Sequence, residues 1–267
     1  MPSRPPIELK PLPPSLKYVF LNDNPGTPVI ISNKLSQDET HRLVTVLERH
    51  RSAIGYSLHD LKGISAAICT HRIPTDPDIP PSREHQCRLN NSMRKVVNKE
   101  VLKLLHAGNI YLVPHSEFVS PVQVVPKKGG MAVVENEKNE LIPQRIVTGW
   151  RMCIDYRKLN KAIKKDHFPL PFIDEMLERL AKHSFFCFLD GYFKYHQIMI
   201  HPDDQSKTTF TCPYGTYAYR RMSFGLCNAL ASFQWCMMSI FSDMIEKIME
   251  VFMDKFTVYD TTILMIV

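Results

Sequence analysis

FCFLD, residues 186–190, and MEVFMD, residues 249–254, are the two segments of this 267-residue chain that decide its fold. Each is a short, mostly apolar run that ends in an aspartate, as a buried β-strand does when its last residue reaches the edge of a sheet. Two such strands lying side by side would bring Asp190 and Asp254 together, although these residues are far apart along the chain. The two segments therefore predict a sheet whose edge carries a pair of carboxylates.

A carboxylate pair of this kind has chemical consequences. Neighbouring carboxylates repel each other and resist joint ionisation unless a cation compensates them. Mg²⁺ prefers oxygen ligands and is commonly held by one or two carboxylates together with substrate phosphates. Two such ions could activate a hydroxyl group and stabilise a leaving pyrophosphate. Aspartates at strand ends are also ordinary turn residues, so the spacing alone leaves both interpretations open.

The rest of the sequence predicts strands and helices that do not alternate regularly. Strands are expected at 17–21, 28–31, 120–125, 151–156, 197–200, 208–212, 217–222 and within 251–259. Helices are expected after the capping-box residue Ser36, over 92–107, from Pro171 and over 229–249. Residues 127–147 contain glycines and are expected to form a mobile excursion. This order favours an α+β fold, with helices packed on one side of a mainly antiparallel sheet.

The composition is that of a globular protein with a mild basic excess. Apolar residues make up 44% and charged residues 22%, and the formal net charge is +6. The longest apolar runs have about five residues, far fewer than the roughly 20 that cross a bilayer, and the proline-rich N-terminus lacks the apolar segment of a signal peptide. Residues 151–165 hold six basic residues and one acidic residue, a formal charge of +5. This patch favours a polyanionic partner, although a solvated basic face is the alternative.

Ordered motifs along most of the chain resemble the reverse transcriptase region of plant gypsy-type LTR retrotransposon polyproteins. They are SPVQVVPKKGG (120–130), VTGWRMCIDYRKLNKA (147–162), DHFPLPFIDEMLERLA (166–181), CFLDGY (187–192), KTTFTCPYGTYAYRRM (207–222), FGLCNA (224–229) and SIFSDMIEKIMEVFMD (239–254). The resemblance implies the fingers and palm of a right-hand polymerase over residues 81–267, after a linker over residues 1–80 that follows a protease in the parent polyprotein. It also implies RNA-directed DNA polymerase activity, which adds deoxynucleotides to a primer 3′ end.

The same resemblance implies roles for individual residues in catalysis and triphosphate binding. Asp190 and Asp254 correspond to the catalytic aspartates of the family, which would hold two Mg²⁺ ions. Lys127 and Arg151 correspond to the fingers cations that bind the incoming triphosphate. An arginine suits this role because its planar fork can pair two phosphate oxygens at once, whereas a lysine acts as a point charge.

Further positions match residues that contact the nucleotide or the nucleic acid. Tyr195 corresponds to the aromatic ring that excludes a ribose 2′-hydroxyl, with a core tyrosine as the alternative. Gln234 corresponds to a helix-borne glutamine beside the nucleotide and template. Basic residues expected to contact the nucleic-acid backbone are Arg157, Lys158, Lys161, Arg220 and Arg221. Such binding should weaken steeply with salt through counterion release.

The chain also departs from the family pattern. Lys255 stands where the family has the second aspartate of its hairpin, a change of two charge units that disfavours divalent metal at this site. Phe193 and Lys194 replace a Ser-Gly pair and add bulk near the nucleotide. The family pattern is lost after Tyr259, so we expect a domain truncated at its C-terminus, without the thumb. We therefore predict that nucleotidyl transfer by this copy is impaired.

Two other functions stay open. The chain could be a non-catalytic remnant that binds nucleic acid, or a decayed retroelement product with no selected role. The expected partners are an RNA or DNA template-primer and deoxynucleoside triphosphates, with no membrane. The expected location is inside the cell, in cytoplasm or nucleus. The sequence does not indicate an oligomeric state.

Overall fold

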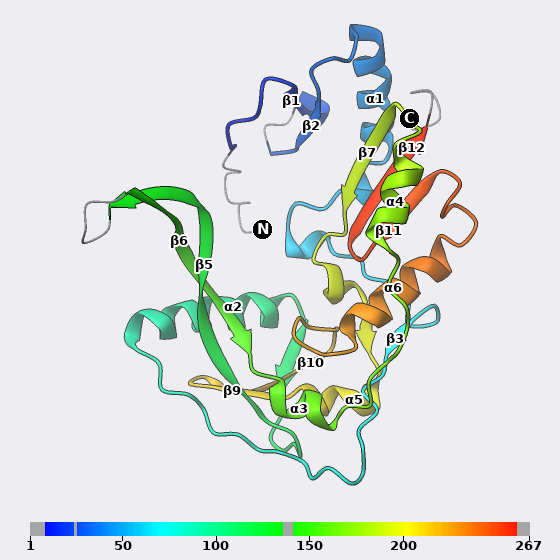
Figure 1. The fold of residues 1–267 in the computed structure, drawn as a ribbon. Coiled ribbons are helices and arrows are strands. Elements are labelled where there is room, and N and C mark those ends of the chain that lie inside the picture. Colours follow the sequence, from blue (N-terminus) through cyan, green and yellow to red (C-terminus); the bar gives the residue numbers. More distant parts are fainter. Residues whose placement is uncertain (1–8, 24–25, 136–140, 261–267) are drawn as a thin grey trace. The chain divides into compact units, whose positions relative to one another are not determined.

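The computed structural model describes residues 9–23, 26–135 and 141–260. The chain forms two compact units that alternate along the sequence, and Figure 1 labels their elements. Unit 1 comprises Met1–Lys62, Leu170–Lys194 and Met237–Val267, and unit 2 comprises Gly63–Pro169 and Tyr195–Cys236. The division into a linker and a fingers–palm domain near residue 80 stays a prediction. The loss of the family pattern after Tyr259 concerns residues 260–267, of which 261–267 lie outside the described residues.

Unit 1 is centred on an antiparallel sheet of three strands in the order β11-β12-β7. Its strands are β7 (Phe185–Asp190), β11 (Met249–Phe252) and β12 (Lys255–Asp260). The two segments that end in aspartate are therefore strands, as predicted. Asp190 is the last residue of β7, and Asp254 lies in the two-residue turn between β11 and β12.

Helix α4 (Ile173–Leu180) belongs to the same unit and begins two residues after Pro171. Arg179 near its end binds Glu250 of β11 through two hydrogen bonds, 2.5 and 3.1 Å long. Glu250 is only 2% exposed, so this bidentate ion pair compensates a buried charge at the point where the helix meets the sheet.

The N-terminal part of unit 1 is a hairpin followed by a helix. β1 (Leu16–Phe20) pairs antiparallel with β2 (Pro28–Ser32), and α1 covers Gln37–Arg49. The Ser36 side chain accepts from the N–H of Glu39, while the Glu39 carboxylate accepts from the N–H of Ser36. This capping box satisfies two backbone donors that the helix leaves unpaired. The two predicted strands and the predicted helix start after Ser36 are confirmed, and the strands pair as a hairpin.

Unit 2 contains a five-stranded sheet in the order β4-β10-β9-β5-β6. Its strands are β4 (Ile110–Leu112), β5 (Ser120–Glu135), β6 (Leu141–Ile154), β9 (Phe210–Cys212) and β10 (Gly215–Tyr219). The pair β5 and β9 is parallel, and the other neighbours are antiparallel. A separate parallel pair joins β3 (Thr70–His71) to β8 (Met199–Ile200).

Four α-helices belong to, or begin in, unit 2. They are α2 (Asn91–His106), α3 (Arg157–Ala162), α5 (Pro202–Gln205) and α6 (Ala229–Ile240). Short 3-10 turns in the described chain are Leu21–Asp23, Arg51–Ala53, Leu58–Asp60, Lys194–Gln197 and Ser206–Thr208. No helix in the described part of the chain combines the length and the apolar character that crossing a membrane requires.

Helix α2 follows the predicted pattern closely. The side chain of Asn90 accepts from the N–H of Met93 at 2.8 Å and so caps the first turn. Val97, Val101 and Leu104 form the buried face. Gly108 ends the helix with φ at +68°, a left-handed conformation that glycine adopts without steric cost.

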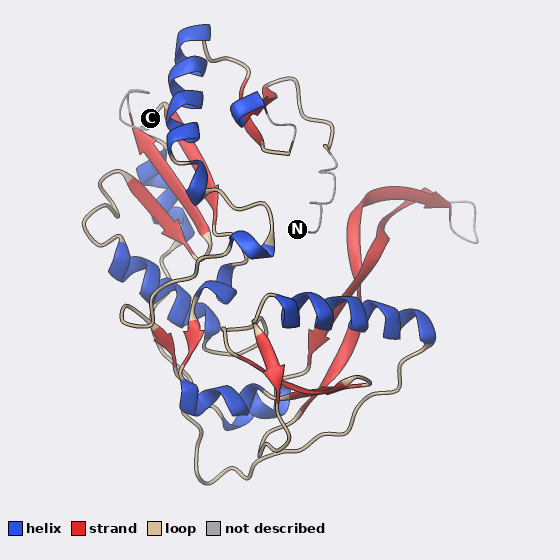
Figure 2. Ribbon diagram, turned by 180° about the vertical axis from the view of Figure 1, so that it is seen from behind, coloured by secondary structure: helices blue, strands red, loops and turns tan. Residues whose placement is uncertain are grey.

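Residues 127–147 are a correction to the prediction. Of these, residues 127–135 and 141–147 lie in a long hairpin of β5 and β6, drawn as strands in Figure 2, and not in an irregular excursion. The two glycines lie where the pairing register shifts between Lys128 and Met131, since a bulge accommodates residues that weaken a regular strand. The glycines therefore mark an irregularity within the hairpin and not its end.

The C-terminal helix is also shorter than predicted. α6 ends at Ile240 instead of Met249. The segment after it contains Glu246 with φ at +66°, a left-handed conformation that interrupts a right-handed helix. Met249 already belongs to β11 and pairs with Val258. The left-handed turn and the pairing of Met249 in β11 therefore end the helical apolar spacing before residue 249.

Candidate active site and nucleic-acid interface

The ends of β7 and β11 bring Asp190 and Asp254 together in unit 1. β7 pairs antiparallel with β12 so that Asp190 lies opposite Lys255, the residue after Asp254. The N–H of Gly191 donates to the carbonyl oxygen of Asp254 at 2.7 Å. Both aspartates therefore lie at one edge of the sheet, as the sequence predicted. The expectation that their two strands lie side by side is wrong, because β12 lies between β11 and β7. Asp254 reaches the end of β7 from the turn that joins β11 to β12.

Each of the two aspartates is paired with a lysine. The Nζ atom of Lys194 lies 2.6 Å from Oδ2 of Asp254, and the Nζ atom of Lys255 lies 2.9 Å from Oδ2 of Asp190. We call these four residues the Asp–Lys cluster. Its formal charge is zero, because two carboxylates face two ammonium groups.

The two ion pairs differ in their exposure to water. The side chain of Asp254 is 8% exposed and that of Lys194 is 48% exposed, whereas those of Asp190 and Lys255 are 63% and 60% exposed. Burial raises the pKa of Asp254, but the hydrogen bond and the charge of the Lys194 ammonium outweigh burial and hold this pKa below its ordinary value. Asp254 is therefore stabilised in its charged form.

The Asp–Lys cluster in this arrangement does not fit the Mg²⁺ ions that the family resemblance implies. A divalent cation needs free carboxylate oxygens, and one oxygen of each aspartate is already in contact with an ammonium group. Within residues 9–23, 26–135 and 141–260, no three His, Cys, Asp or Glu side chains gather as metal ligands. The positions of the two aspartates suit a metal site, but the two ammonium groups beside them do not.

Lys127 and Arg151, the predicted triphosphate-binding cations, lie on the β5–β6 hairpin of unit 2. Arg151 is opposite Val125, and Lys127 is opposite Gly149. Directly opposed residues share a face of the sheet, as do residues two apart on one strand. Lys127 and Arg151 therefore lie on one face as diagonal neighbours, and both are exposed.

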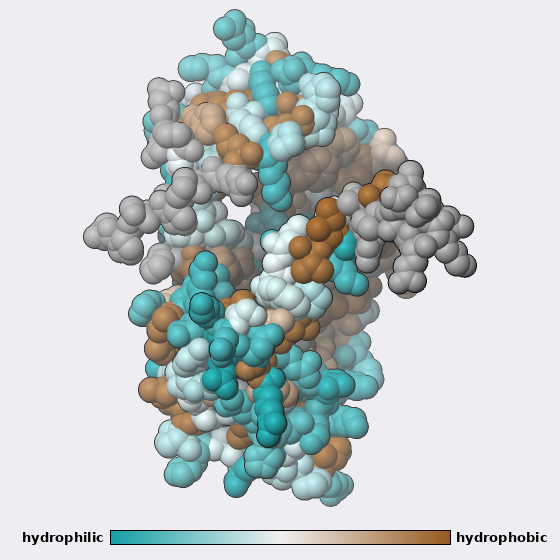
Figure 3. Space-filling model, turned by 90° about the vertical axis from the view of Figure 1, so that its left-hand side faces the viewer, coloured by the Kyte–Doolittle hydropathy of each residue, from teal (hydrophilic) through white to brown (hydrophobic). Residues whose placement is uncertain are grey.

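Two of the basic residues on and before α3 already have acidic partners. Nε of Arg157 donates to Oδ1 of Asp155 at 2.7 Å, and Nζ of Lys158 lies 3.1 Å from Oε2 of Glu84. Lys161 is exposed on the same helix. The basic patch is therefore partly neutralised locally, although the cations themselves remain at the surface. Hydrophilic side chains are mixed with hydrophobic ones over the visible face of unit 2 in Figure 3.

Arg220 and Arg221 are in different surroundings. The guanidinium of Arg220 lies over the ring of Tyr111, 4.6 Å from its centroid, and the residue is exposed. Arg221 donates to the carbonyl oxygens of His196 and Gln197 at 3.2 and 3.3 Å. The structure therefore gives Arg221 a role in holding the backbone of unit 2, and its role in nucleic-acid binding stays a prediction.

Tyr195 and Gln234 both lie in unit 2. The ring of Tyr195 packs edge-on against Phe233, with 5.9 Å between ring centroids, and Phe233 is fully buried. Gln234 is 1% exposed on α6. These surroundings agree with a packing role for both residues, and their predicted contacts with a nucleotide stay predictions.

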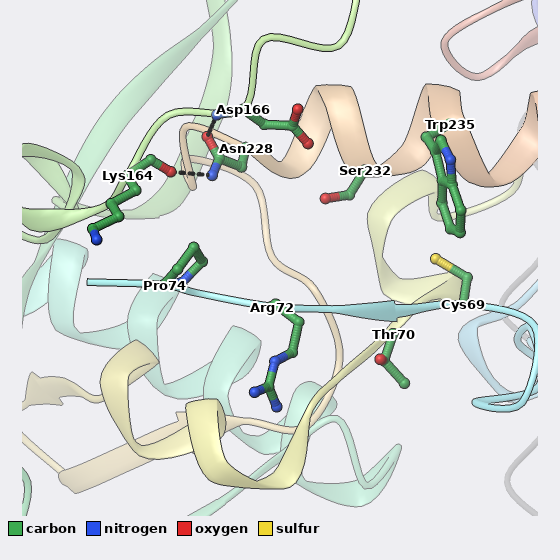
Figure 4. A pocket seen from close by; sticks show the side chains of 9 residues that line it. All are labelled: Cys69, Thr70, Arg72, Pro74, Lys164, Asp166, Asn228, Ser232 and Trp235. Carbon is green, nitrogen blue, oxygen red and sulfur yellow. Dashed lines mark hydrogen bonds between the residues drawn. The ribbon is translucent and has the colours of Figure 1, made fainter. Parts of the chain in front are cut away.

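Unit 2 also contains a pocket of about 340 Å³. It is lined by Cys69, Thr70, Arg72, Pro74, Lys164, Asp166, Asn228, Ser232 and Trp235. Figure 4 shows the Asn228 amide turned toward Lys164 and the backbone of Asp166, where it bonds the Lys164 carbonyl at 2.8 Å and the Asp166 N–H at 3.1 Å. None of the predicted site residues lines this pocket.

Sequence reasoning missed the contact made by Lys194, which was expected only to add bulk. The signal was a lysine four residues after Asp190, close enough along the chain to fold back on the end of the strand. The geometry of that return depends on the backbone at Phe193 and Lys194, whose φ angles are +53° and +37°. Such angles are rare for residues with side chains, so sequence spacing did not indicate them.

Comparison with known proteins identifies the family. A family model described as "Reverse transcriptase (RNA-dependent DNA polymerase)" matches residues 125–263, which is more than half of the chain. The chain therefore belongs to the reverse transcriptase family. The resemblance deduced from the motifs is confirmed.

The relatives in this family include retrotransposon polyproteins. The Retrovirus-related Pol polyprotein from transposon 297 of Drosophila melanogaster is 30% identical over 234 residues, which cover 86% of this chain and 20% of that protein. The corresponding polyprotein from transposon gypsy is 36% identical over 163 residues, which cover 61% of this chain and 14% of that protein. The chain thus spans about a fifth or less of the length of these two relatives.

Solved structures agree on the fold. A mutant of the prototype foamy virus protease–reverse transcriptase matches with a TM-score of 0.69 and 20% identity, covering 87% of this chain and 28% of that one. The foamy viral enzyme in complex with an RNA/DNA hybrid gives a TM-score of 0.66 and 19% identity, covering 86% and 28%. At this identity the likeness concerns the fold alone, and it confirms the predicted α+β class.

Proposed function

We propose that this chain is the fingers and palm portion of a retrotransposon reverse transcriptase that binds a template-primer but is impaired in nucleotidyl transfer. The observation that carries the proposal is the Asp–Lys cluster. The sheet brings two aspartates to one edge, as the polymerase reaction of the family would require. Each aspartate nevertheless faces an ammonium group.

Template-primer binding is supported by the family and by the exposed cations of unit 2. The foamy viral relatives are solved in complex with an RNA/DNA hybrid and with double-stranded DNA. In this chain, Lys127 and Arg151 lie on one exposed face of the hairpin, where they could contact the phosphates of a deoxynucleoside triphosphate or of a strand. Lys161 and Arg220 add exposed positive charge elsewhere in the unit.

Impairment follows from the charge of the cluster. At about 4 Å and an effective dielectric constant near 20, two unit charges interact by roughly 4 kcal/mol. Two lysines beside the aspartates therefore oppose the approach of a divalent cation by several such interactions, although solvent screens the exposed pair. A metal would have to bind the carboxylates beside two ammonium groups or displace them.

Primer extension on a homopolymer template tests this proposal. The unaltered chain should give no Mg²⁺-dependent incorporation above background, and the variant that combines Lys255→Asp with Lys194→Gly should incorporate measurably. Clear extension by the unaltered chain would contradict the impairment. Failure of Lys255→Asp alone to restore extension would show that Lys255 is not sufficient to explain it.

A second candidate function is nucleic-acid binding without chemistry. The neutral Asp–Lys cluster favours it, because binding through exposed cations does not require the aspartates. Gel shifts of the full chain should then depend on salt, show little sequence preference and remain unchanged in Asp190→Asn. A chain that retains no oligonucleotide at low salt would exclude both this function and template-primer binding.

A further inference from the structure

The turn that follows β7 places a lysine against the more buried of the two aspartates. The N–H of Lys194 donates to the carbonyl oxygen of Gly191 at 3.0 Å, and the ring of Phe193 packs edge-on against Tyr192 with 4.7 Å between centroids. The backbone of Lys194 is thereby fixed on the same turn as Gly191, which itself bonds Asp254. The backbone of Lys194 is thus already in position, and its side chain extends from the turn to the Asp254 carboxylate.

The two lysines of the Asp–Lys cluster should not compete equally with a divalent cation. Asp190 and Lys255 are each more than half exposed, so water and salt screen their attraction, and such pairs contribute little. Asp254 is 8% exposed, so its attraction to Lys194 is screened less. A cation that binds Asp254 must displace Lys194 from a partly buried contact, whereas Lys255 can turn into solvent.

Two consecutive residues with side chains hold left-handed backbone angles at this turn. Phe193 has φ at +53° and Lys194 at +37°, conformations that disfavour any residue except glycine. The packing of Phe193 and the ion pair of Lys194 stabilise this backbone. The lysine is therefore held at the carboxylate by the turn and is not a freely moving surface side chain.

We propose that Lys194, more than Lys255, keeps divalent cations out of the Asp–Lys cluster. This inference rests on the proposed function, because it takes Asp190 and Asp254 to be the carboxylate pair of a polymerase. It adds that the side chain of residue 194 occupies the position a cation would need at Asp254. The family departure at residue 255 is then the weaker of two obstacles.

Direct measurement of Mn²⁺ binding to the full chain, by electron paramagnetic resonance of the free ion, tests the inference without any assay of activity. Lys194→Met and Lys255→Met form a matched pair, since each removes one positive charge and keeps a similar volume. We expect Lys194→Met to raise Mn²⁺ affinity about tenfold and Lys255→Met by less than about threefold, as the difference in solvent screening requires. Lys182→Met, at an exposed lysine of unit 1, should leave the affinity unchanged.

Lys194→Gly is the second variant and should show at least the same gain as Lys194→Met, because it also removes the side chain from a left-handed position. If Lys194→Met does not fold, Lys194→Gly takes its place in the comparison with Lys255→Met. Equal or greater affinity in Lys255→Met, or no gain in either variant at position 194, would overturn the inference. Binding of a primer-template by the unaltered chain without metal is measured in parallel. A chain that binds the primer-template but shows no gain in Mn²⁺ affinity at position 194 contradicts the inference alone, whereas a chain that does not bind it contradicts the proposed function.

Discussion

His71 is a buried imidazole that the fold keeps neutral. It is 1% exposed, and its Nδ1 atom lies 2.9 Å from Oγ of Ser232. Burial lowers the pKa of His71 to about 4, although the charges of Asp204 and Asp166 act in the opposite direction. Because the group binds fewer protons in the folded chain than in the unfolded one, its neutral form contributes to stability.

The sign of this linkage gives a pH-dependent prediction. The contribution of His71 is fully present above its unfolded pKa of about 6.5 and is lost as the pH falls toward the folded value of about 4. Between pH 7.5 and 5, the free energy of unfolding should fall by about 2 kcal/mol through this group. Urea unfolding of the full chain and of His71→Asn measures the difference.

His71→Asn should show a correspondingly flatter pH dependence over this interval. His106→Asn is the matched control, because His106 is exposed at the end of α2, and it should keep the dependence of the unaltered chain. An unchanged slope in His71→Asn would show that another group causes the loss of stability.

At the scale of elements, a buried ion pair joins α4 to β11. Glu250 is buried in the strand, and Arg179 of the helix holds it by two hydrogen bonds. The Tyr259 hydroxyl lies 3.4 Å from the same carboxylate. Removing the arginine would leave a buried carboxylate with that single weak partner among the described contacts.

Arg179→Met should therefore destabilise the chain by about 3 kcal/mol, the lower end of the cost of breaking a buried pair, because Arg179 itself is partly exposed. Chemical unfolding followed by circular dichroism gives the value. Lys182→Met, just after α4, should change stability by less than about 0.5 kcal/mol. The double variant of Arg179→Met and Glu250→Met should recover most of the loss; a double variant as unstable as the single one would contradict this account.

Some helices and strands could be predicted from the sequence, and others could not. β7, the β11–β12 hairpin, α1 and α2 were predictable, because apolar runs, capping residues and Gly108 are local signals. The β5–β6 hairpin was not, since Gly129 and Gly130 look like a loop until the partner strand is known. α3 was missed altogether: its six residues, Arg157–Ala162, are too few to show helical periodicity.

The position of the candidate site could be predicted from the sequence, but the pairing of its aspartates with lysines could not be predicted in full. That Asp190 and Asp254 meet follows from two strands that end in aspartate. The contact of Lys194 does not follow, because it depends on left-handed backbone angles at two residues with side chains. The buried position of Gln234 was also hidden, since a polar residue on a helix is usually exposed.

At the scale of the whole molecule, the net charge of +6 and the exposed cations of unit 2 predict electrostatic binding of nucleic acid. Replacing both Lys127 and Arg151 with alanine should weaken oligonucleotide binding and lower the slope of log affinity against log salt by about 2, one for each lost phosphate contact. Fluorescence anisotropy at several salt concentrations measures the slope.

The matched control removes two exposed lysines of unit 1, Lys182 and Lys247. It changes the net charge equally and should leave the slope nearly unaltered. Equal slopes in the two double variants would show that net charge alone, and not the face of the hairpin, determines binding.

The left-handed backbone at Lys194 has a consequence for how the proposed impairment could be reversed by mutation. Function and folding usually oppose each other at an active site, since residues that serve the reaction often weaken the chain. Here a change to glycine would relieve about 1 kcal/mol of backbone strain and at the same step uncover the Asp254 carboxylate. The relief offsets part of the cost of leaving that buried carboxylate without its ammonium partner. Among the residues that glycine could replace, a left-handed position is therefore one where the change is least costly to folding.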